Sequence, residues 1–181
     1  MNQLSDSFII QTVAEDVAKG CSQLVKRYKE PLYWHVRRIV EDHQDAEDAL
    51  QETFIKLYRS AEMLPKVLSL TAWVYRIATN EALRLVGRRA PVAESLSEPS
   101  ASAVSALYAD EYFDYSDIEA VKLKQAMDSL PQKQKLVFSL RYYDDLPYEE
   151  IARIADTSVT AAKVSYHIAR NKVIKHLGLN A

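Results

Sequence analysis

Residues 147–173 have the sequence PYEEIARIADTSVTAAKVSYHIARNKV, and they carry the most specific structural signal in the chain. Pro147 suits the first position of a helix, because its φ angle is already helical and its missing N–H would be unpaired there. Further on, Asp156 tolerates the left-handed conformation of a tight turn, and Ser158 is able to cap a following helix. The stretch therefore predicts a short helix, a tight turn and a second helix from Val159, which is a helix-turn-helix.

The second helix of this motif has two different faces. One face is apolar and would pack inward, and it consists of Val159, Ala162, Tyr166, Ala169 and Val173. The other face is suited to a major groove, where residues near the start of a recognition helix read base edges. Our candidates for base contacts are Thr160, Ala161, Lys163, Val164 and His167. Farther along lie Arg170, Lys172 and Lys175, and we expect them to hold phosphates. The alternative is a solvated basic face on an ordinary bundle helix.

The composition changes on the N-terminal side of this motif. Residues 91–116 contain two prolines, five serines between Ser95 and Ser105, and no Lys or Arg. Such a composition predicts a linker, so we assign residues 1–90 and 117–181 to two separate domains. Part of the linker is too apolar for a pure spacer and is expected to dock on another surface. Its apolar side chains are Val104, Leu107, Tyr108, Tyr112, Phe113 and Tyr115.

Helical periodicity dominates the first 90 residues. The predicted helices are one at the N-terminus followed by 22–40, 45–60 and 71–89. Residues 61–70 contain Pro65 and fit a loop or a broken turn. In the third helix, apolar side chains recur with the spacing of one buried stripe, at Ala46, Ala49, Leu50, Phe54, Leu57 and Tyr58. The chain has only 3 glycines among many helix-forming residues, and we therefore predict an all-α fold of two small helical domains.

The net charge of −2 conceals strong local contrasts. Residues 41–52 contain six carboxylates and no Lys or Arg. In contrast, four arginines between Arg76 and Arg89 share their segment with a single acid, Glu81. Because binding depends on the local field rather than on the total charge, the chain is compatible with both a basic protein partner and a nucleic acid.

The acidic segment falls on the third predicted helix. Asp48, Gln51 and Glu52 lie on the face opposite the apolar stripe, where they are able to meet a basic partner helix. The alternative is a solvated acidic face. A metal site is a weaker interpretation, because the chain has neither a Glu-x-x-His pair nor a glycine-turned calcium loop.

Cysteine content and hydropathy restrict the compartment. Cys21 is the only cysteine, so the chain can form neither an internal disulfide nor a thiolate zinc site, and we expect a reducing, cytoplasmic location. Residues 1–8 lack a secretory pattern, and no stretch approaches the roughly 20 apolar residues of a membrane helix. We see no catalytic triad, phosphate loop or metal motif, and we expect no enzyme activity, cofactor or small-molecule substrate.

A series of short motifs runs through the C-terminal half. They are Leu130-Pro131, Val137-Phe138, Arg141-Tyr142-Tyr143, Tyr148-Glu149-Glu150-Ile151-Ala152, Ser158-Val159 and Ala169-Arg170. In this order they resemble the fourth conserved region of the bacterial extracytoplasmic-function (ECF) sigma factors of RNA polymerase. The resemblance implies that this domain binds the upstream, minus-thirty-five promoter element through the recognition helix described above.

The N-terminal half also resembles this family, in its second conserved region. Residues 45–54, DAEDALQETF, are similar to the helix whose polar face docks on the clamp coiled coil of the polymerase's largest subunit. The resemblance implies that Asp45, Asp48, Gln51 and Glu52 bind the polymerase. Residues 72–80, AWVYRIATN, are similar to the helix that, with the loop before it, recognises and opens the downstream, minus-ten element.

By this resemblance the minus-ten candidates are Trp73, Tyr75, Arg76, Asn80, Arg84 and Arg88. Aromatic faces are able to stack on unpaired bases, and arginines are able to follow a nucleic-acid backbone. Trp73 and Tyr75 also suit a core position, and both interpretations stay open at this point. The loop at 61–70 would hold a captured base.

The resemblance implies three kinds of partner: core RNA polymerase, promoter DNA and a cognate anti-sigma factor. Two other classes of function remain as alternatives from the residues alone. A conventional helix-turn-helix regulator would explain residues 147–173 but not the acidic helix followed by the aromatic and basic one. A helical metalloenzyme would use the carboxylates near Asp48 and would contain bound metal.

Overall fold

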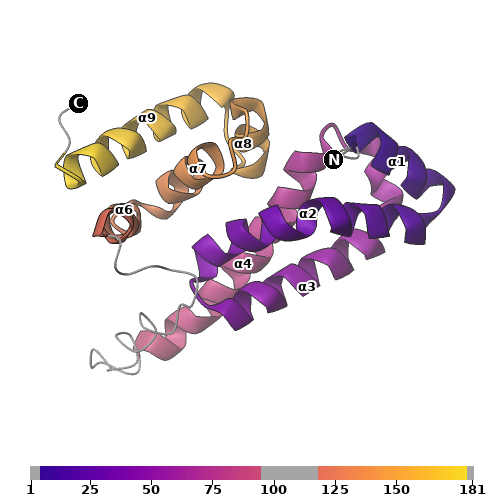
Figure 1. Cartoon of the computed structure of the whole chain (residues 1–181), viewed down its shortest axis with the longest axis horizontal. Coiled ribbons are helices and arrows are strands. Elements are labelled where there is room, and N and C mark those ends of the chain that lie inside the picture. Colours follow the sequence, from indigo (N-terminus) through magenta and orange to yellow (C-terminus); the bar gives the residue numbers. More distant parts are fainter. Residues whose placement is uncertain (1–4, 95–117, 179–181) are drawn as a thin grey trace. The chain divides into compact units, whose positions relative to one another are not determined.

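The computed structural model describes residues 5–94 and 118–178, and every regular element in these ranges is a helix (Figure 1). The chain divides into two compact units, one within residues 1–98 and the other within residues 99–181. The predicted all-α fold with two small helical domains is confirmed. The predicted linker and its apolar side chains lie outside the described residues, apart from positions 91–94, which continue a helix.

Helix capping explains where the helices of the first unit begin. Within residues 5–94 its elements are α1 (Asp6–Glu15), α2 (Val17–Val40), α3 (His43–Arg59), the 3₁₀ helix η1 (Ala61–Lys66) and α4 (Leu70–Glu94). α2 begins earlier than predicted because Asp16 caps it, with its Oδ1 accepting a hydrogen bond from the Lys19 N–H at 2.9 Å. Ser5 and Asp42 cap α1 and α3 in the same way.

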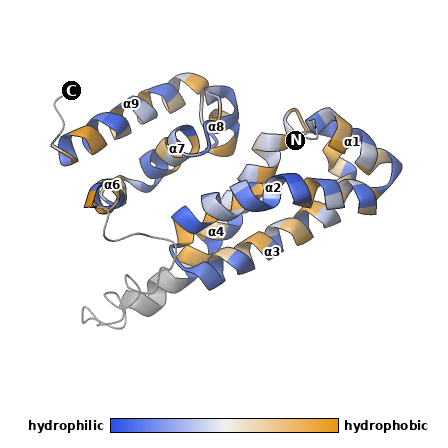
Figure 2. Ribbon diagram, in the orientation of Figure 1, coloured by the Kyte–Doolittle hydropathy of each residue, from blue (hydrophilic) through white to orange (hydrophobic). Residues whose placement is uncertain are grey.

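α2, α3 and α4 pack against one another, and α1 packs against α2 (Figure 1). Figure 2 shows polar and apolar residues alternating along these helices, as expected of helices with one buried side. The almost completely buried side chains include Leu24, Leu32, Val36, Leu57, Leu70 and Val74. A polar pair lies among them, with His35 Nε2 at 2.8 Å from Thr79 Oγ1. This core holds α3 and α4 side by side.

The segment predicted as a loop or a broken turn contains η1. Ala61 and Leu64 are buried, and Pro65 lies in the last turn of this short helix. Leu68, which follows η1, is 91% exposed. The segment therefore presents an apolar side chain to solvent just before α4 begins.

In the second unit, α9 packs against each of the other helices. Within residues 118–178 the elements are α6 (Ile118–Asp128), α7 (Gln132–Tyr142), α8 (Tyr148–Ile154) and α9 (Val159–His176). One cluster of buried side chains consists of Ala126, Met127, Leu130, Phe138, Ala169 and Val173. Because α9 supplies two members of this cluster, its orientation depends directly on the core.

The structure contains the predicted helix-turn-helix in α8 and α9. Asp156 adopts the left-handed conformation at φ 50°. Ser158 Oγ accepts a hydrogen bond from the Ala161 N–H at 3.1 Å and so caps α9. Pro147 differs by one position, because it precedes α8 as its cap rather than occupying the first helical position. Its ψ of 153° is extended, and its carbonyl accepts the first α-helical hydrogen bond, from the Ile151 N–H at 3.1 Å.

None of the described helices is both long enough and apolar enough to cross a membrane.

Candidate nucleic-acid and protein interfaces

α9 exposes its entire set of predicted DNA-contacting side chains. The exposed residues of the set are Thr160, Ala161, Lys163, Val164, His167, Arg170 and Lys172. On the opposite side, Ala162 and Ala169 are completely buried and Val173 nearly so. Three of the five residues predicted for the inward face are therefore buried, and the other two, Val159 and Tyr166, are half-buried.

Neighbouring side chains orient several groups on the outer face of α9. His167 Nε2 lies 3.1 Å from Asn171 Nδ2, one turn further along the helix. Lys172 Nζ donates a hydrogen bond to Gln134 Oε1 of α7 at 2.9 Å. The face therefore carries basic groups whose positions are partly defined before any ligand arrives.

The acidic face of α3 is also directed outward. Asp48, Gln51 and Glu52 are exposed, and Asp45 is partly buried. The buried stripe on the other side consists of Ala46, Ala49, Leu50, Thr53 and Leu57. In the ranges 5–94 and 118–178, no three His, Cys, Asp or Glu side chains gather as a metal ion would require. The exposed residues of α3 lie on the side of the helix opposite its buried stripe.

On α4, the predicted minus-ten residues fall into three environments. Arg76, Asn80 and Arg88 are exposed. Trp73 is half-buried, so that part of its side chain faces solvent. Tyr75 is only 4% exposed.

Burial of Tyr75 removes it from the outer surface. Its ring packs edge-on against the imidazole of His35 in α2, with the ring centroids 5.0 Å apart. A base that stacked on Tyr75 would have to displace this core contact. Of the two interpretations that the sequence left open for Tyr75, its burial and its contact with His35 support the core position.

Arg84 is held by a buried carboxylate that the sequence did not single out as a site residue. Glu81 is 3% exposed, and its Oε2 accepts a hydrogen bond from Arg84 Nε at 2.9 Å and lies 2.7 Å from Arg84 Nη2. Its other oxygen, Oε1, pairs with Lys56 Nζ of α3. Burial acts to raise the pKa of Glu81, but the hydrogen bonds and charges of the two cations outweigh it and hold the pKa below its ordinary value.

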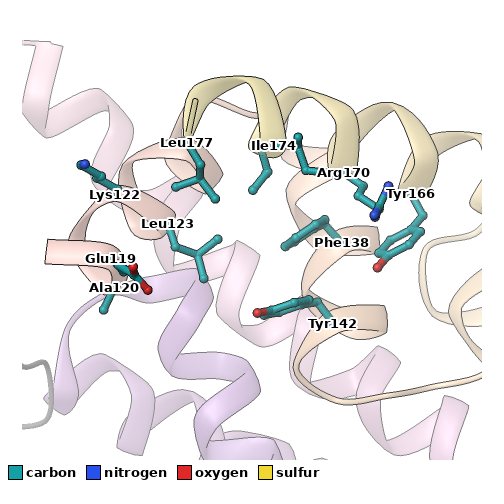
Figure 3. A pocket seen from close by; sticks show the side chains of 11 residues that line it. Glu119, Ala120, Lys122, Leu123, Phe138, Tyr142, Tyr166, Arg170, Ile174 and Leu177 are labelled. Atoms are coloured by element: carbon teal, nitrogen blue, oxygen red, sulfur yellow. The ribbon is translucent and has the colours of Figure 1, made fainter. Parts of the chain in front are cut away.

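A pocket of about 710 Å³ opens between α6, α7 and α9 in the second unit (Figure 3). The side chains of Leu123, Phe138, Ile174 and Leu177 supply apolar lining, and Tyr142 and Tyr166 lie beside Phe138. The Phe138 ring stacks on the Tyr142 ring, with centroids 5.2 Å apart. Arg170 lines the pocket as well as belonging to the predicted DNA face. A ligand in this pocket would thus lie next to that face.

Comparison with known proteins places both halves of the chain in one family. Residues 24–91 match Sigma-70 region 2, and residues 120–173 match Sigma-70, region 4. The ECF RNA polymerase sigma-E factor of Escherichia coli K12 is 30% identical over 94% of this chain and 93% of its own length. The sigma-E factor of Haemophilus influenzae is also 30% identical, over 94% of both chains.

Two solved structures share the fold. One is CnrH in complex with the cytosolic domain of CnrY, with a TM-score of 0.68 and 18% identity over 97% of this chain and 99% of that one. The other is the sigma factor RpoE in complex with the anti-sigma factor NepR from Bartonella quintana, with a TM-score of 0.69 and 21% identity over 88% and 98% of the two chains. With both Sigma-70 regions matched in order and relatives aligned over nearly the whole length, the chain belongs to the ECF family of RNA polymerase sigma factors and acts in promoter-specific transcription initiation.

Proposed function

We propose that this sigma factor divides its work among three surfaces: an acidic face on α3 for the polymerase, and basic faces on α4 and α9 for two promoter elements. The observation that carries the proposal is the separation of charge on neighbouring helices of one unit. α3 exposes Asp48, Gln51 and Glu52, whereas α4 exposes Arg76 and Arg88.

The α3 face would dock on the clamp coiled coil of the polymerase's largest subunit. Its acidic side chains are exposed while the opposite side of the helix is fixed in the core, so the face needs no rearrangement to meet a basic helix. Complementary charge accelerates such an encounter and selects its partner. Asp45 is partly buried and would therefore contribute only at the edge of this face.

The α4 face would meet the downstream, minus-ten element. Exposed Arg76, Asn80 and Arg88 suit the backbone and base edges of an opened strand, and the half-buried Trp73 retains a surface on which a base is able to stack. Arg84, which is oriented by its ion pair with Glu81, would also contribute to this face. The segment at 61–70 would hold a captured base.

The α9 face would enter the major groove of the upstream, minus-thirty-five element. Thr160, Ala161, Lys163, Val164 and His167 are the proposed base contacts, and Arg170 and Lys172 the proposed phosphate contacts. The faces on α3 and α4 belong to the domain proposed at residues 1–90, and the face on α9 belongs to the domain proposed at residues 117–181. Residues 91–116 would form the linker between them. The chain would act in the cytoplasm as an initiation subunit without catalysis or a cofactor of its own.

An anti-sigma factor is the third proposed partner. Both CnrH and the Bartonella RpoE were solved in complex with a second protein, and the latter partner is an anti-sigma factor. In this chain Arg170 belongs both to the DNA face and to the pocket of the second unit. A protein that covered the pocket would therefore compete with DNA for this arginine.

Reconstituted transcription tests the function. Core polymerase from the source organism, supplied with genomic templates, should start transcripts at defined promoters only when this chain is added. If no template gave a promoter-dependent transcript, the assignment to initiation would fail. A pull-down with core polymerase separates this function from that of a conventional helix-turn-helix regulator, which would bind a duplex site without polymerase and usually as a dimer.

A further inference from the structure

The aromatic ring of Tyr148 contacts side chains from both neighbouring helices of the second unit. Lys163 Nζ of α9 lies over this ring, 5.7 Å from its centroid. The guanidinium carbon of Arg141, in α7, lies 5.5 Å from the same centroid. The ring of Tyr166, also in α9, meets it edge-on at 6.1 Å. The first residue of α8 therefore contacts the recognition helix through one cation and one aromatic ring.

The position of this ring is well defined. Arg141 Nη1 pairs with Asp145 Oδ1 at 2.9 Å and donates to the Leu146 carbonyl at 3.1 Å, which fixes the guanidinium beside the turn that leads into α8. On the other side, the Tyr166 ring stacks on the buried ring of Phe138 with centroids 5.7 Å apart. Tyr148 is thus braced by a fixed cation and by a ring that belongs to the core.

Lys163 differs from Tyr148 in being exposed and in having a long, flexible side chain. An ammonium group over an aromatic ring is attracted by the negative electrostatic potential of the ring face. The attraction restricts the rotamers of the side chain and leaves the donors of the ammonium group available on the outside. A lysine held in this way loses less conformational entropy when it meets a base edge or a phosphate.

We propose that Tyr148 is a positioning residue for promoter recognition, which holds the Lys163 ammonium over its ring in the place where that group contacts DNA. The inference rests on the proposed function of α9. It adds a residue outside that helix to those that determine the DNA specificity of α9. Tyr148 acts through Lys163 and needs no DNA contact of its own.

A double-mutant cycle tests the proposal with holoenzyme made from the full chain. The probe is a fluorescent duplex containing the upstream element, obtained by selecting random DNA with the wild-type holoenzyme. Tyr148→Leu should weaken binding by about two- to fivefold, and Tyr148→Phe, which keeps the ring, should bind like the wild type. In a Lys163→Ala background, Tyr148→Leu should cause no further loss.

Tyr143→Leu is the matched control and should bind like the wild type, because Tyr143 is an exposed tyrosine of the same unit whose ring meets the Tyr142 ring edge-on. A loss from Tyr148→Leu that is equally large with and without Lys163 would overturn the proposal, since it would indicate a structural role. If Lys163→Ala has no effect while Thr160→Ala and Arg170→Ala weaken binding, this inference fails but α9 remains the DNA face. If all three are without effect, the proposed function of α9 fails too.

A measurement on the unaltered protein covers the case in which Tyr148→Leu does not fold. Protons next to the ammonium group of a lysine that lies over an aromatic ring resonate upfield in NMR spectra. We expect this shift for the Hε protons of Lys163 but not for those of Lys175, an exposed lysine in the last turn of α9. Equal resonance positions for the two lysines would contradict the contact on which the proposal depends.

Discussion

Lys56 of α3 and Glu81 of α4, 25 positions apart in the chain, form an ion pair between the helix proposed to bind polymerase and the helix proposed to bind DNA. Arg84 occupies the other oxygen of the same carboxylate. One buried acid thus joins two helices and also orients an arginine on the proposed DNA face of α4.

The first prediction concerns the pH dependence of this contact. Because the pKa of Glu81 is lower in the folded chain than its ordinary value of 4.5, the carboxylate stabilises the fold above that pH. The contribution is lost as the pH falls through the lower, folded pKa. Glu81→Gln removes the charge that pairs with Lys56 and Arg84 and should reduce the free energy of unfolding by about 1–2 kcal/mol at neutral pH. The loss is no larger because both cations are partly solvated.

Urea unfolding followed by tryptophan fluorescence measures this effect, since both tryptophans, Trp34 and Trp73, lie in the first unit. The difference between wild type and Glu81→Gln should shrink below about pH 4.5. Glu30→Gln, at an exposed position of α2, is the control and should change little at any pH. A difference that stays constant down to about pH 3.5 would argue against the pairing.

The second prediction concerns the close approach of α1 and α2 at Gly20. A Cβ atom at this position would lie 2.5 Å from the Val13 backbone nitrogen, so the helices would have to move apart. We expect Gly20→Ala to destabilise the first unit by about 1–3 kcal/mol, despite the better helix propensity of alanine. Gly87→Ala in α4 meets no atom within 4 Å and should be stabilising by about 0.5–1 kcal/mol. Equal effects in urea unfolding would contradict this packing.

The third prediction addresses the α3 face. Reversing its charge with Asp48→Lys or Glu52→Lys should weaken binding to core polymerase on the order of tenfold, because like charges would then face each other. Glu15→Lys makes the same change in charge at the exposed end of α1 and should bind normally. Biolayer interferometry on immobilised core polymerase gives the comparison. Equal losses for Glu15→Lys and Asp48→Lys would point to a general effect of net charge.

The fourth prediction distinguishes phosphate contacts from base contacts on α9. Arg170→Ala should weaken binding of holoenzyme to all upstream sequences alike and should reduce the slope of log affinity against log salt by about 0.9. His167→Ala should instead relax the sequence preference and leave the slope nearly unchanged. Lys19→Ala, at an exposed position in the first turn of α2, controls for loss of one positive charge. A slope that is insensitive to Arg170 would remove it from the DNA contacts.

Much of α9 could be predicted from the sequence alone. The period of 3.6 residues places Ala162, Ala169 and Val173 on one side, and all three are buried in the structure. Ser158 has the side chain that a helix start requires, and it does cap α9. These features depend on interactions within a short stretch, which local sequence determines.

The environment of α4 could not be predicted in the same way. Tyr75 is buried because His35 packs against it from α2, and the acid at Glu81 is significant because Lys56 approaches it from α3. Both relationships join residues far apart in sequence. A single carboxylate among four arginines was the available signal for Glu81, but its partner on another helix is a product of tertiary packing.

The two sides of α9 also differ in how freely they are able to change. Ala162 and Ala169 are fully buried, and a larger side chain at either place would push the helix out of position. The outer side chains of Thr160 and Val164 are exposed, so larger side chains at these positions would not displace the helix. On the proposed function of α9, variants with a new promoter preference are therefore to be sought by randomising the outer positions while the two buried alanines are kept.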